Sequence, residues 1–153
     1  MKVLVLNCGS SSIKYKLFEM TTKEVLAQGG IEKIGLPGSF LKLTLPNGEK
    51  KVIEKDVPEH TTGVQFIFDS LTNAEYGAVS NLHEIKAVGH RVLHGGTKFS
   101  GSVLIDDAVI AAVEECCDLG PLHNPANLKG IYAVQKLLPE VPQVAVFDTA
   151  FHQ

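Results

Sequence analysis

The chain has 153 residues, of which 44% are hydrophobic and 20% charged, and its formal net charge is −3. This composition is typical of a globular domain with a buried core. It shows no excess of basic residues of the kind that binds a nucleic acid or a membrane surface. There is no signal-peptide pattern, no apolar run near the roughly 18 residues of a membrane span, and no metal or disulfide spacing among the three cysteines. We therefore expect a cytoplasmic protein with reduced thiols.

The first part of the chain predicts an antiparallel meander. Residues 2–7 are a Val/Leu run typical of a buried strand, and residues 12–19 alternate between apolar and polar side chains. Residues 25–34 predict a third strand, weakened by two adjacent glycines. Residues 40–45 and 50–53 flank Asn47-Gly48, a strong hairpin signal, and we interpret this hairpin as a peripheral addition.

The rest of the chain alternates between helical and strand patterns. Apolar residues at helical spacing predict helices, and Pro125 and Pro139 suit the start and the stop of the last helix, with Asn124 as its N-cap. In chain order we expect a helix over 61–71, a strand over 85–93, helices over 106–117 and 125–138, and a strand over 141–147.

Setting the hairpin aside, the element order is β-β-β-α-β-α-α-β. Three antiparallel strands followed by helical crossovers to parallel strands resemble the ribonuclease-H-like α/β fold. The resemblance implies a mixed five-stranded sheet of order 3-2-1-4-5, flanked by helices, with strands one, four and five parallel.

Polar side chains occupy the carboxyl ends of the three strands that this fold would make parallel. Asn7 follows strand one, His90 and Arg91 lie near the end of strand four, and Asp148 follows strand five. Ligands of open α/β sheets bind beyond these ends, and neighbouring strands are about 4.8 Å apart. We therefore expect an amide, a guanidinium and a carboxylate to converge on one crevice.

The turn Gly9-Ser10-Ser11-Ser12 lies directly beside Asn7. A glycine-serine turn offers backbone N–H groups and hydroxyls to an anion, although such turns are also common without any ligand. Lys14 follows on the polar side of strand two and is either a charge for that anion or a solvated lysine.

Histidines near the second cluster leave several interpretations open. His90 and His94 lack a third metal ligand at useful spacing, so Arg91 binding a carboxylate or phosphate is the better hypothesis. His123 precedes a predicted helix N-terminus, where it either contacts an anion or only closes the loop.

Four segments together are similar to the motifs of acetate kinase and its acetokinase family of carboxylate kinases. They are residues 6–14 (LNCGSSSIK), 89–96 (GHRVLHGG), 121–125 (PLHNP) and 146–152 (VFDTAFH). Propionate and butyrate kinases share much of this pattern. The resemblance runs the whole length of the chain, and it implies the actin and sugar-kinase superfamily.

The resemblance implies Mg²⁺-dependent, reversible transfer of a phosphoryl group from ATP, the co-substrate, to acetate, with ADP and acetyl phosphate as products. A carboxylate nucleophile has a pKa of about 4 and needs no strong base, so Asp148 is expected to orient the site or Mg²⁺. The resemblance also implies that Asn7 lies at the metal and phosphate end of the site, and that the phosphate-binding residues are Gly9, Ser10, Ser11, Ser12 and Lys14. Arg91 would bind the carboxylate and the phosphoryl group, and His123 would contact the phosphoryl group. Leu93 and Leu122 would form walls of the pocket for the substrate methyl group. Members of the family often have valine where this chain has Leu93.

The resemblance also implies a larger protein. Residues 1–153 would be the N-terminal domain of a two-domain, homodimeric kinase, with the nucleotide domain beyond them and little activity in this part alone. The alternatives are a propionate or butyrate kinase, or a non-catalytic domain that binds an acyl phosphate or mediates dimerisation.

Overall fold

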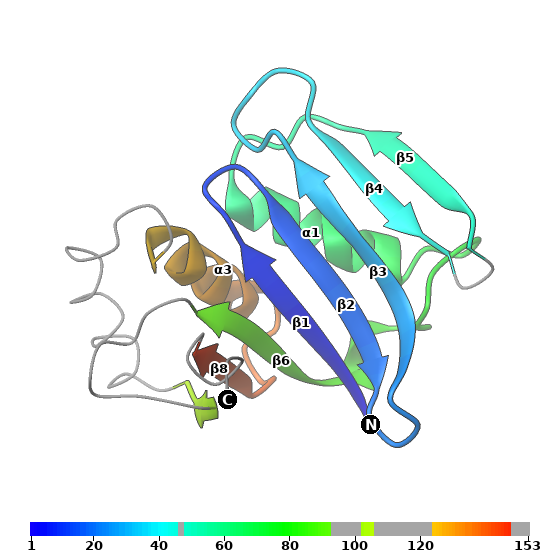
Figure 1. Cartoon of the computed structure of the whole chain (residues 1–153), viewed down its shortest axis with the longest axis vertical. Coiled ribbons are helices and arrows are strands. Elements are labelled where there is room, and N and C mark those ends of the chain that lie inside the picture. The colour runs from blue at the N-terminus through cyan, green and yellow to red at the C-terminus, as the bar shows by residue number, and fades with distance from the viewer. Residues whose placement is uncertain (46–47, 93–101, 106–123, 148–153) are drawn as a thin grey trace.

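The structure is a computed structural model that describes residues 1–45, 48–92, 102–105 and 124–147. Its described strands form one sheet in the order β5-β4-β3-β2-β1-β6-β8-β7 (Figure 1). The strands are β1 Lys2–Cys8, β2 Ile13–Glu19, β3 Glu24–Glu32, β4 Phe40–Thr44, β5 Lys50–Glu54, β6 Ile85–Val92, β7 Ser102–Leu104 and β8 Gln143–Phe147.

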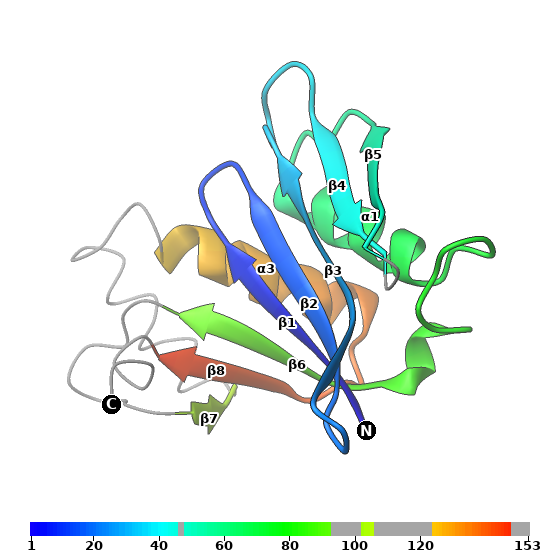
Figure 2. The ribbon, with the colours of Figure 1, turned by 45° about the vertical axis from the view of Figure 1, so that its right-hand side comes forward.

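The centre of this sheet has the expected topology. The order β3-β2-β1-β6-β8 is the predicted order 3-2-1-4-5, and β1, β6 and β8 run parallel, as expected. Their arrowheads reach the same edge of the sheet in Figure 2. The sequence therefore predicted correctly which strand ends meet.

Two details of the sheet differ from the prediction. The hairpin of β4 and β5 is not a separate attachment: β4 pairs with β3 and extends the same sheet, with Leu41 and Leu43 buried. Strand β7 was not predicted, because three residues are too few to show a period of two. It pairs antiparallel with β8 and ends this side of the sheet.

Both described helices cover the same face of the sheet (Figure 1). Helix α1, His60–Leu71, buries the expected stripe of Val64, Ile67, Phe68 and Leu71. Helix α3, Asn124–Leu137, includes Asn124 as its first residue, one position earlier than predicted. The helix expected over 106–117 lies outside the described residues, and neither described helix has the length and apolarity to cross a bilayer.

The core fills the space between the sheet and these helices. Alternation along β2 turns Ile13, Tyr15 and Leu17 toward the helices, where all three are buried, and leaves Lys14 and Lys16 exposed on the opposite face. The sheet therefore has one apolar face and one face that carries charge.

Candidate functional site

A groove of about 670 Å³ runs across the exposed face of the sheet. It is lined by three of the predicted site residues: Asn7 of β1 and Arg91 of β6, which were expected at the strand ends, and Lys14 of β2, which was expected beside the serine turn. The structure thus brings together an amide, an ammonium and a guanidinium that are separated along the chain. The strand order predicted that Asn7 and Arg91 would meet, while Asp148, the carboxylate expected with them, lies outside the described residues.

The register of the strands explains why these side chains face the groove. Leu6 and His90 are partners in the parallel ladder between β1 and β6, and both are buried on the helix side. Asn7 and Arg91 are the next residues on their strands, so alternation turns them to the other face. Lys14 pairs with Asn7 in the antiparallel ladder between β1 and β2.

The groove is strongly basic for a chain with a net negative charge. Sequence reasoning missed part of this charge: Lys16, Lys42 and Lys50 also line the groove, and Glu32 is its one acidic lining residue among those that the structure describes. Alternation alone places Lys14 and Lys16 on one face, but only the pairing of β3 with β4 brings Lys42 beside them. Such a surface attracts anions with several negative charges.

The turn Gly9–Ser12 lies at the end of β1, and its backbone is fixed by hydrogen bonds. The Gly9 N–H donates to the Ser12 carbonyl at 2.8 Å, and the Ile34 N–H donates to the Ser11 carbonyl at 2.9 Å. The Gly9 N–H is therefore used inside the turn. Among the described residues, the N–H groups of Ser10 and Ser11 and the three serine hydroxyls have no hydrogen-bond partner.

Ser10 does not line the groove. It lines a separate depression of about 470 Å³ together with His60 and Lys129. The predicted phosphate-binding residues are therefore divided between two neighbouring places: Lys14 lies in the groove, while Ser10 lies beside the N-terminal end of α1.

His60 is a residue that sequence reasoning did not single out. Its Nε2 donates to the Gly9 carbonyl at 2.7 Å, because a carbonyl oxygen only accepts. The side chain is 4% exposed, and burial, with a smaller contribution from Lys129, lowers the pKa of the imidazole. A neutral His60 therefore holds the start of the serine turn. The sequence feature that could have indicated this role is the position of a polar residue, His60, at the start of a predicted helix.

His90 does not join Arg91 at the groove, although both lie near the end of the predicted strand four. It is 1% exposed, and its Nε2 lies 2.5 Å from Gln143 Oε1. Gln143 in turn donates to the Ile131 carbonyl at 3.3 Å. Burial lowers the pKa of His90 to about 4, although the bond to Gln143 opposes this effect. His90 connects β6, β8 and α3 as a neutral structural residue.

The part of the chain that the structure describes contains no cluster of three or more histidine, cysteine or acidic side chains suited to a metal. Among the described residues, Asn7 and Gln28 line the groove with amide oxygens. Four further predicted site residues lie outside the described residues: Leu93, Leu122, His123 and Asp148.

Comparison with known proteins agrees with the fold and the motifs. The family model of the acetokinase family matches residues 2–153. The acetate kinases of Bacteroides thetaiotaomicron and Phocaeicola vulgatus are each 72% identical over 153 residues. Those matches cover 100% of this chain and 38% of each relative, so the chain spans well under half the length of these curated relatives.

Solved structures give the same result. The crystal structure of Porphyromonas gingivalis acetate kinase superposes with a TM-score of 0.95 at 67% identity, covering 98% of this chain and 38% of that one. A propionate kinase from Francisella tularensis superposes with a TM-score of 0.88 at 40% identity, covering 99% of this chain and 38% of that one. With its sheet order, its groove and its full-length match to the family model, the chain belongs to the acetokinase family.

Proposed function

We propose that this chain provides the phosphoryl- and carboxylate-binding part of an acetate kinase, which catalyses ATP + acetate ⇌ ADP + acetyl phosphate. The observation that carries the proposal is the convergence of Asn7, Lys14 and Arg91 on one basic groove. Membership of the acetokinase family supports the reaction class.

The chemistry of phosphoryl transfer suits such a groove. The protein mainly positions the reactants and neutralises the charge on the transferred group. The planar fork of Arg91 matches the oxygens of a carboxylate and of a phosphoryl group, which a single ammonium does not. Lys14 and the lysines beside it add positive charge for the phosphates of the nucleotide. Acetate is ionised at neutral pH, so its attack needs alignment rather than a strong base.

Mg²⁺ would neutralise phosphate charge in this reaction. It prefers oxygen ligands and is commonly held by one or two carboxylates together with substrate phosphates. Among the described residues, Asn7 fits as one oxygen ligand of the metal. Its cationic neighbours would repel a free metal ion, so we propose that the metal binds together with the nucleotide. The roles of Asp148 as an orienting carboxylate, of His123 at the phosphoryl group, and of Leu93 and Leu122 as methyl-pocket walls belong to the same proposal.

The proposal extends to the architecture of the whole protein. Residues 1–153 would form the N-terminal domain of a two-domain kinase, and a second domain would hold the adenosine of ATP. The support is that relatives named acetate kinase match this chain over 38% of their length. A cytoplasmic homodimer is the assembly we propose, on the resemblance to the family.

Titration calorimetry with acetyl phosphate tests the proposal on the chain itself. We expect weak binding that Arg91→Lys reduces by at least about tenfold, although this change keeps the charge. Lys136→Ala is the matched control, because Lys136 is an exposed cation on α3, away from the groove. Equal binding by wild type and Arg91→Lys would contradict the proposal. Tight binding with no transfer from ATP in the longer protein would favour a non-catalytic domain.

A propionate kinase is the second candidate, because such an enzyme shares 40% identity and the fold. One methylene in an apolar pocket changes binding by only about 1–3 kcal/mol. Comparing kcat/KM for acetate, propionate and butyrate in the longer protein separates the candidates. A preference for acetate supports the proposal, and a preference for a longer acid supports the alternative.

A further inference from the structure

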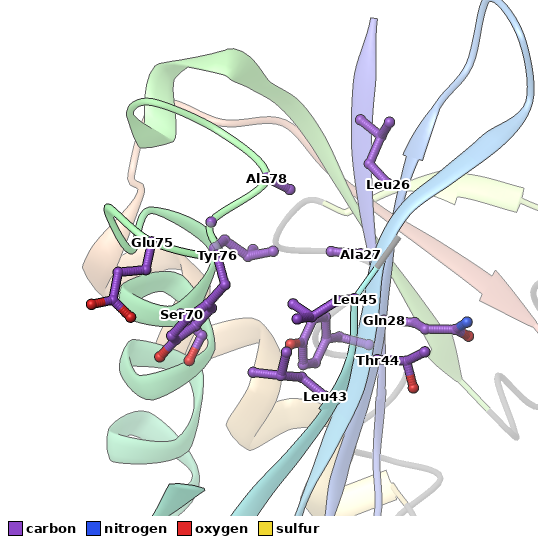
Figure 3. Close-up of a pocket in the computed structure, with 13 residues that line it drawn as sticks. Leu26, Ala27, Gln28, Leu43, Thr44, Leu45, Ser70, Glu75, Tyr76 and Ala78 are labelled. Carbon is purple, nitrogen blue, oxygen red and sulfur yellow. The ribbon is translucent and has the colours of Figure 1, made fainter. Parts of the chain in front are cut away.

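A second cavity lies on the opposite side of the sheet from the groove, and nothing in the proposed reaction uses it. It has a volume of about 350 Å³. Figure 3 shows it between the sheet and the end of α1. The sheet side contributes Ala27 of β3, Leu43 of β4 and Leu45, which follows β4, and the end of α1 with the next segment contributes Ser70 and Tyr76. Ligand pockets of proteins begin at about 300 Å³, so the size suits a small molecule.

Tyr15 places an unpaired polar atom at this cavity. Its side chain lines the cavity and is 4% exposed, and its hydroxyl has no hydrogen-bond partner among the described residues. Buried hydroxyls are almost always paired, because an unpaired one loses its bonds to water without replacement. The Tyr15 hydroxyl therefore indicates a missing partner.

The hydroxyl is held in place by the neighbouring strand. Tyr15 and Gly29 are partners in the ladder between β2 and β3. A Cβ at position 29 would lie 3.0 Å from the Tyr15 Oη and 2.6 Å from the Lys42 carbonyl. Glycine at this position leaves room for the tyrosine ring to extend across β3, toward Leu43 on β4.

The other lining groups define the ligand by its charge. The Ser70 hydroxyl donates to the Phe66 carbonyl at 2.9 Å and keeps its lone pairs free. Of the described residues, no lysine, arginine or histidine lines the cavity, whereas Glu75 does. The walls are otherwise mainly apolar: Leu26, Ala27, Leu43, Leu45, Leu71 and Ala78. The Lys51 ammonium lies 5.1 Å from the centroid of the Tyr76 ring but does not line the cavity. An anion such as acetate or phosphate therefore meets no cationic group in the described walls, and the cavity is chemically unlike the groove.

We propose that this cavity binds a small uncharged molecule with an aromatic or branched apolar body and one oxygen atom that accepts a hydrogen bond from the Tyr15 hydroxyl. Aromatic alcohols are the class that fits these features. Burial raises the pKa of the Tyr15 phenol, with a smaller contribution from Tyr76, so the group is protonated and able to donate at neutral pH.

The test uses benzyl alcohol as the probe and follows the backbone amide resonances of the 153-residue chain by NMR. We expect saturable shifts of Ala27, Leu45 and Ala78, which lie around the cavity. Ethylbenzene is the matched probe without the oxygen, and benzoate is the matched anion. Benzyl alcohol should bind about fivefold more tightly than ethylbenzene, as one neutral hydrogen bond allows. Benzoate should not bind.

Two variants make the test specific. Tyr15→Phe removes only the hydroxyl, so it should fold, and it should bind benzyl alcohol and ethylbenzene equally. Ala78→Leu should fill the cavity and abolish binding of both probes. The proposal is overturned if benzyl alcohol gives no saturable shifts at these residues, if benzoate binds as well, or if Tyr15→Phe retains the preference for the alcohol.

Discussion

Two buried histidines each connect distant parts of this fold by a side-chain hydrogen bond, and neither lies in a metal cluster or in the groove among the residues described. His60 holds the Gly9 carbonyl from 51 residues away, and His90 holds Gln143 from 53 residues away. Burial lowers the pKa of both side chains. Both are therefore neutral near pH 7, where they act through single hydrogen bonds rather than through charge.

Stability should fall as the pH decreases from 6.5 to 4. The folded-state pKa of His90, about 4, lies below its ordinary value of 6.5, so the unfolded chain binds more protons in this window. Each tenfold difference in proton affinity is worth about 1.4 kcal/mol, so the free energy of unfolding should lose about 3 kcal/mol. His60 acts in the same direction. The measurement is urea unfolding at several pH values.

The control for this pH dependence is His90→Gln. This variant should be less stable at pH 7, because the buried pair with Gln143 is disturbed, but its stability should change less between pH 6.5 and 4. An identical slope in wild type and variant would show that His90 is not the titrating group.

His60→Ala should loosen the serine turn as well as lower stability. It leaves the Gly9 carbonyl without its donor and a cavity behind it, at a cost of about 2–4 kcal/mol. Hydrogen exchange should speed up at Gly9 and Ile34, whose N–H groups bond within and to the turn. His60→Gln, which keeps a donor, should restore part of the protection. The exposed His83 is the control, and His83→Ala should change stability by less than about 0.5 kcal/mol.

At the scale of elements, close contact between α3 and β1 depends on a glycine. A Cβ at Gly130 would lie 2.5 Å from the Cys8 Sγ. Cys8 is 4% exposed, and burial raises the pKa of its thiol to about 12, so it is an unreactive packing group. The helix can pass this close to the strand because position 130 has no side chain.

Gly130→Ala should therefore destabilise the protein by about 1–3 kcal/mol, as overpacking does. This is opposite in sign to the gain of up to about 1 kcal/mol that alanine brings inside an unhindered helix. Adding Cys8→Ala should recover part of the loss, because the sulfur atom in the way is removed. Gly63→Ala in α1 is the control, since its nearest contact is the flexible Ile13 Cδ1 at 3.0 Å. Thermal unfolding of the wild type, Gly130→Ala, Cys8→Ala and the double variant measures the coupling, and simple additivity would refute the contact.

At the scale of the whole molecule, the described elements already form one continuous core. Buried residues from β1, β2, β3, β4, β6, α1 and α3 belong to a single hydrophobic cluster. The sheet is also continuous from β5 to β7. One core shared by all these elements is the condition for cooperative unfolding.

The 153-residue chain should accordingly fold alone and unfold in one transition. Far-UV circular dichroism reports the helices and strands, and tyrosine fluorescence reports the environment of three tyrosines. The two transitions should coincide on heating. Separate midpoints, or a gradual loss of signal without a transition, would contradict this prediction.

Much of the architecture could be predicted from the sequence, because local patterns determine it. Alternation along β2 separates Lys14 from Tyr15, and the helical period of α1 selects its buried stripe. The resemblance to a known fold then supplied the strand order, and with it the meeting of Asn7 and Arg91. Strand β7 was missed, since three residues carry too little pattern.

The roles of individual side chains were decided by the tertiary structure. His90 and Arg91 are adjacent and both polar, yet the register of β6 buries the first and turns the second into the groove. The contact of His60 with Gly9 and the position of Lys42 depend on elements that meet only after folding. Local sequence sets the period and direction of each element. Which residues contact each other across tens of positions in the chain is decided by how the faces of the helices and strands pack. The reason is that apolar side chains are buried and buried polar groups are hydrogen-bonded only once the whole molecule has folded.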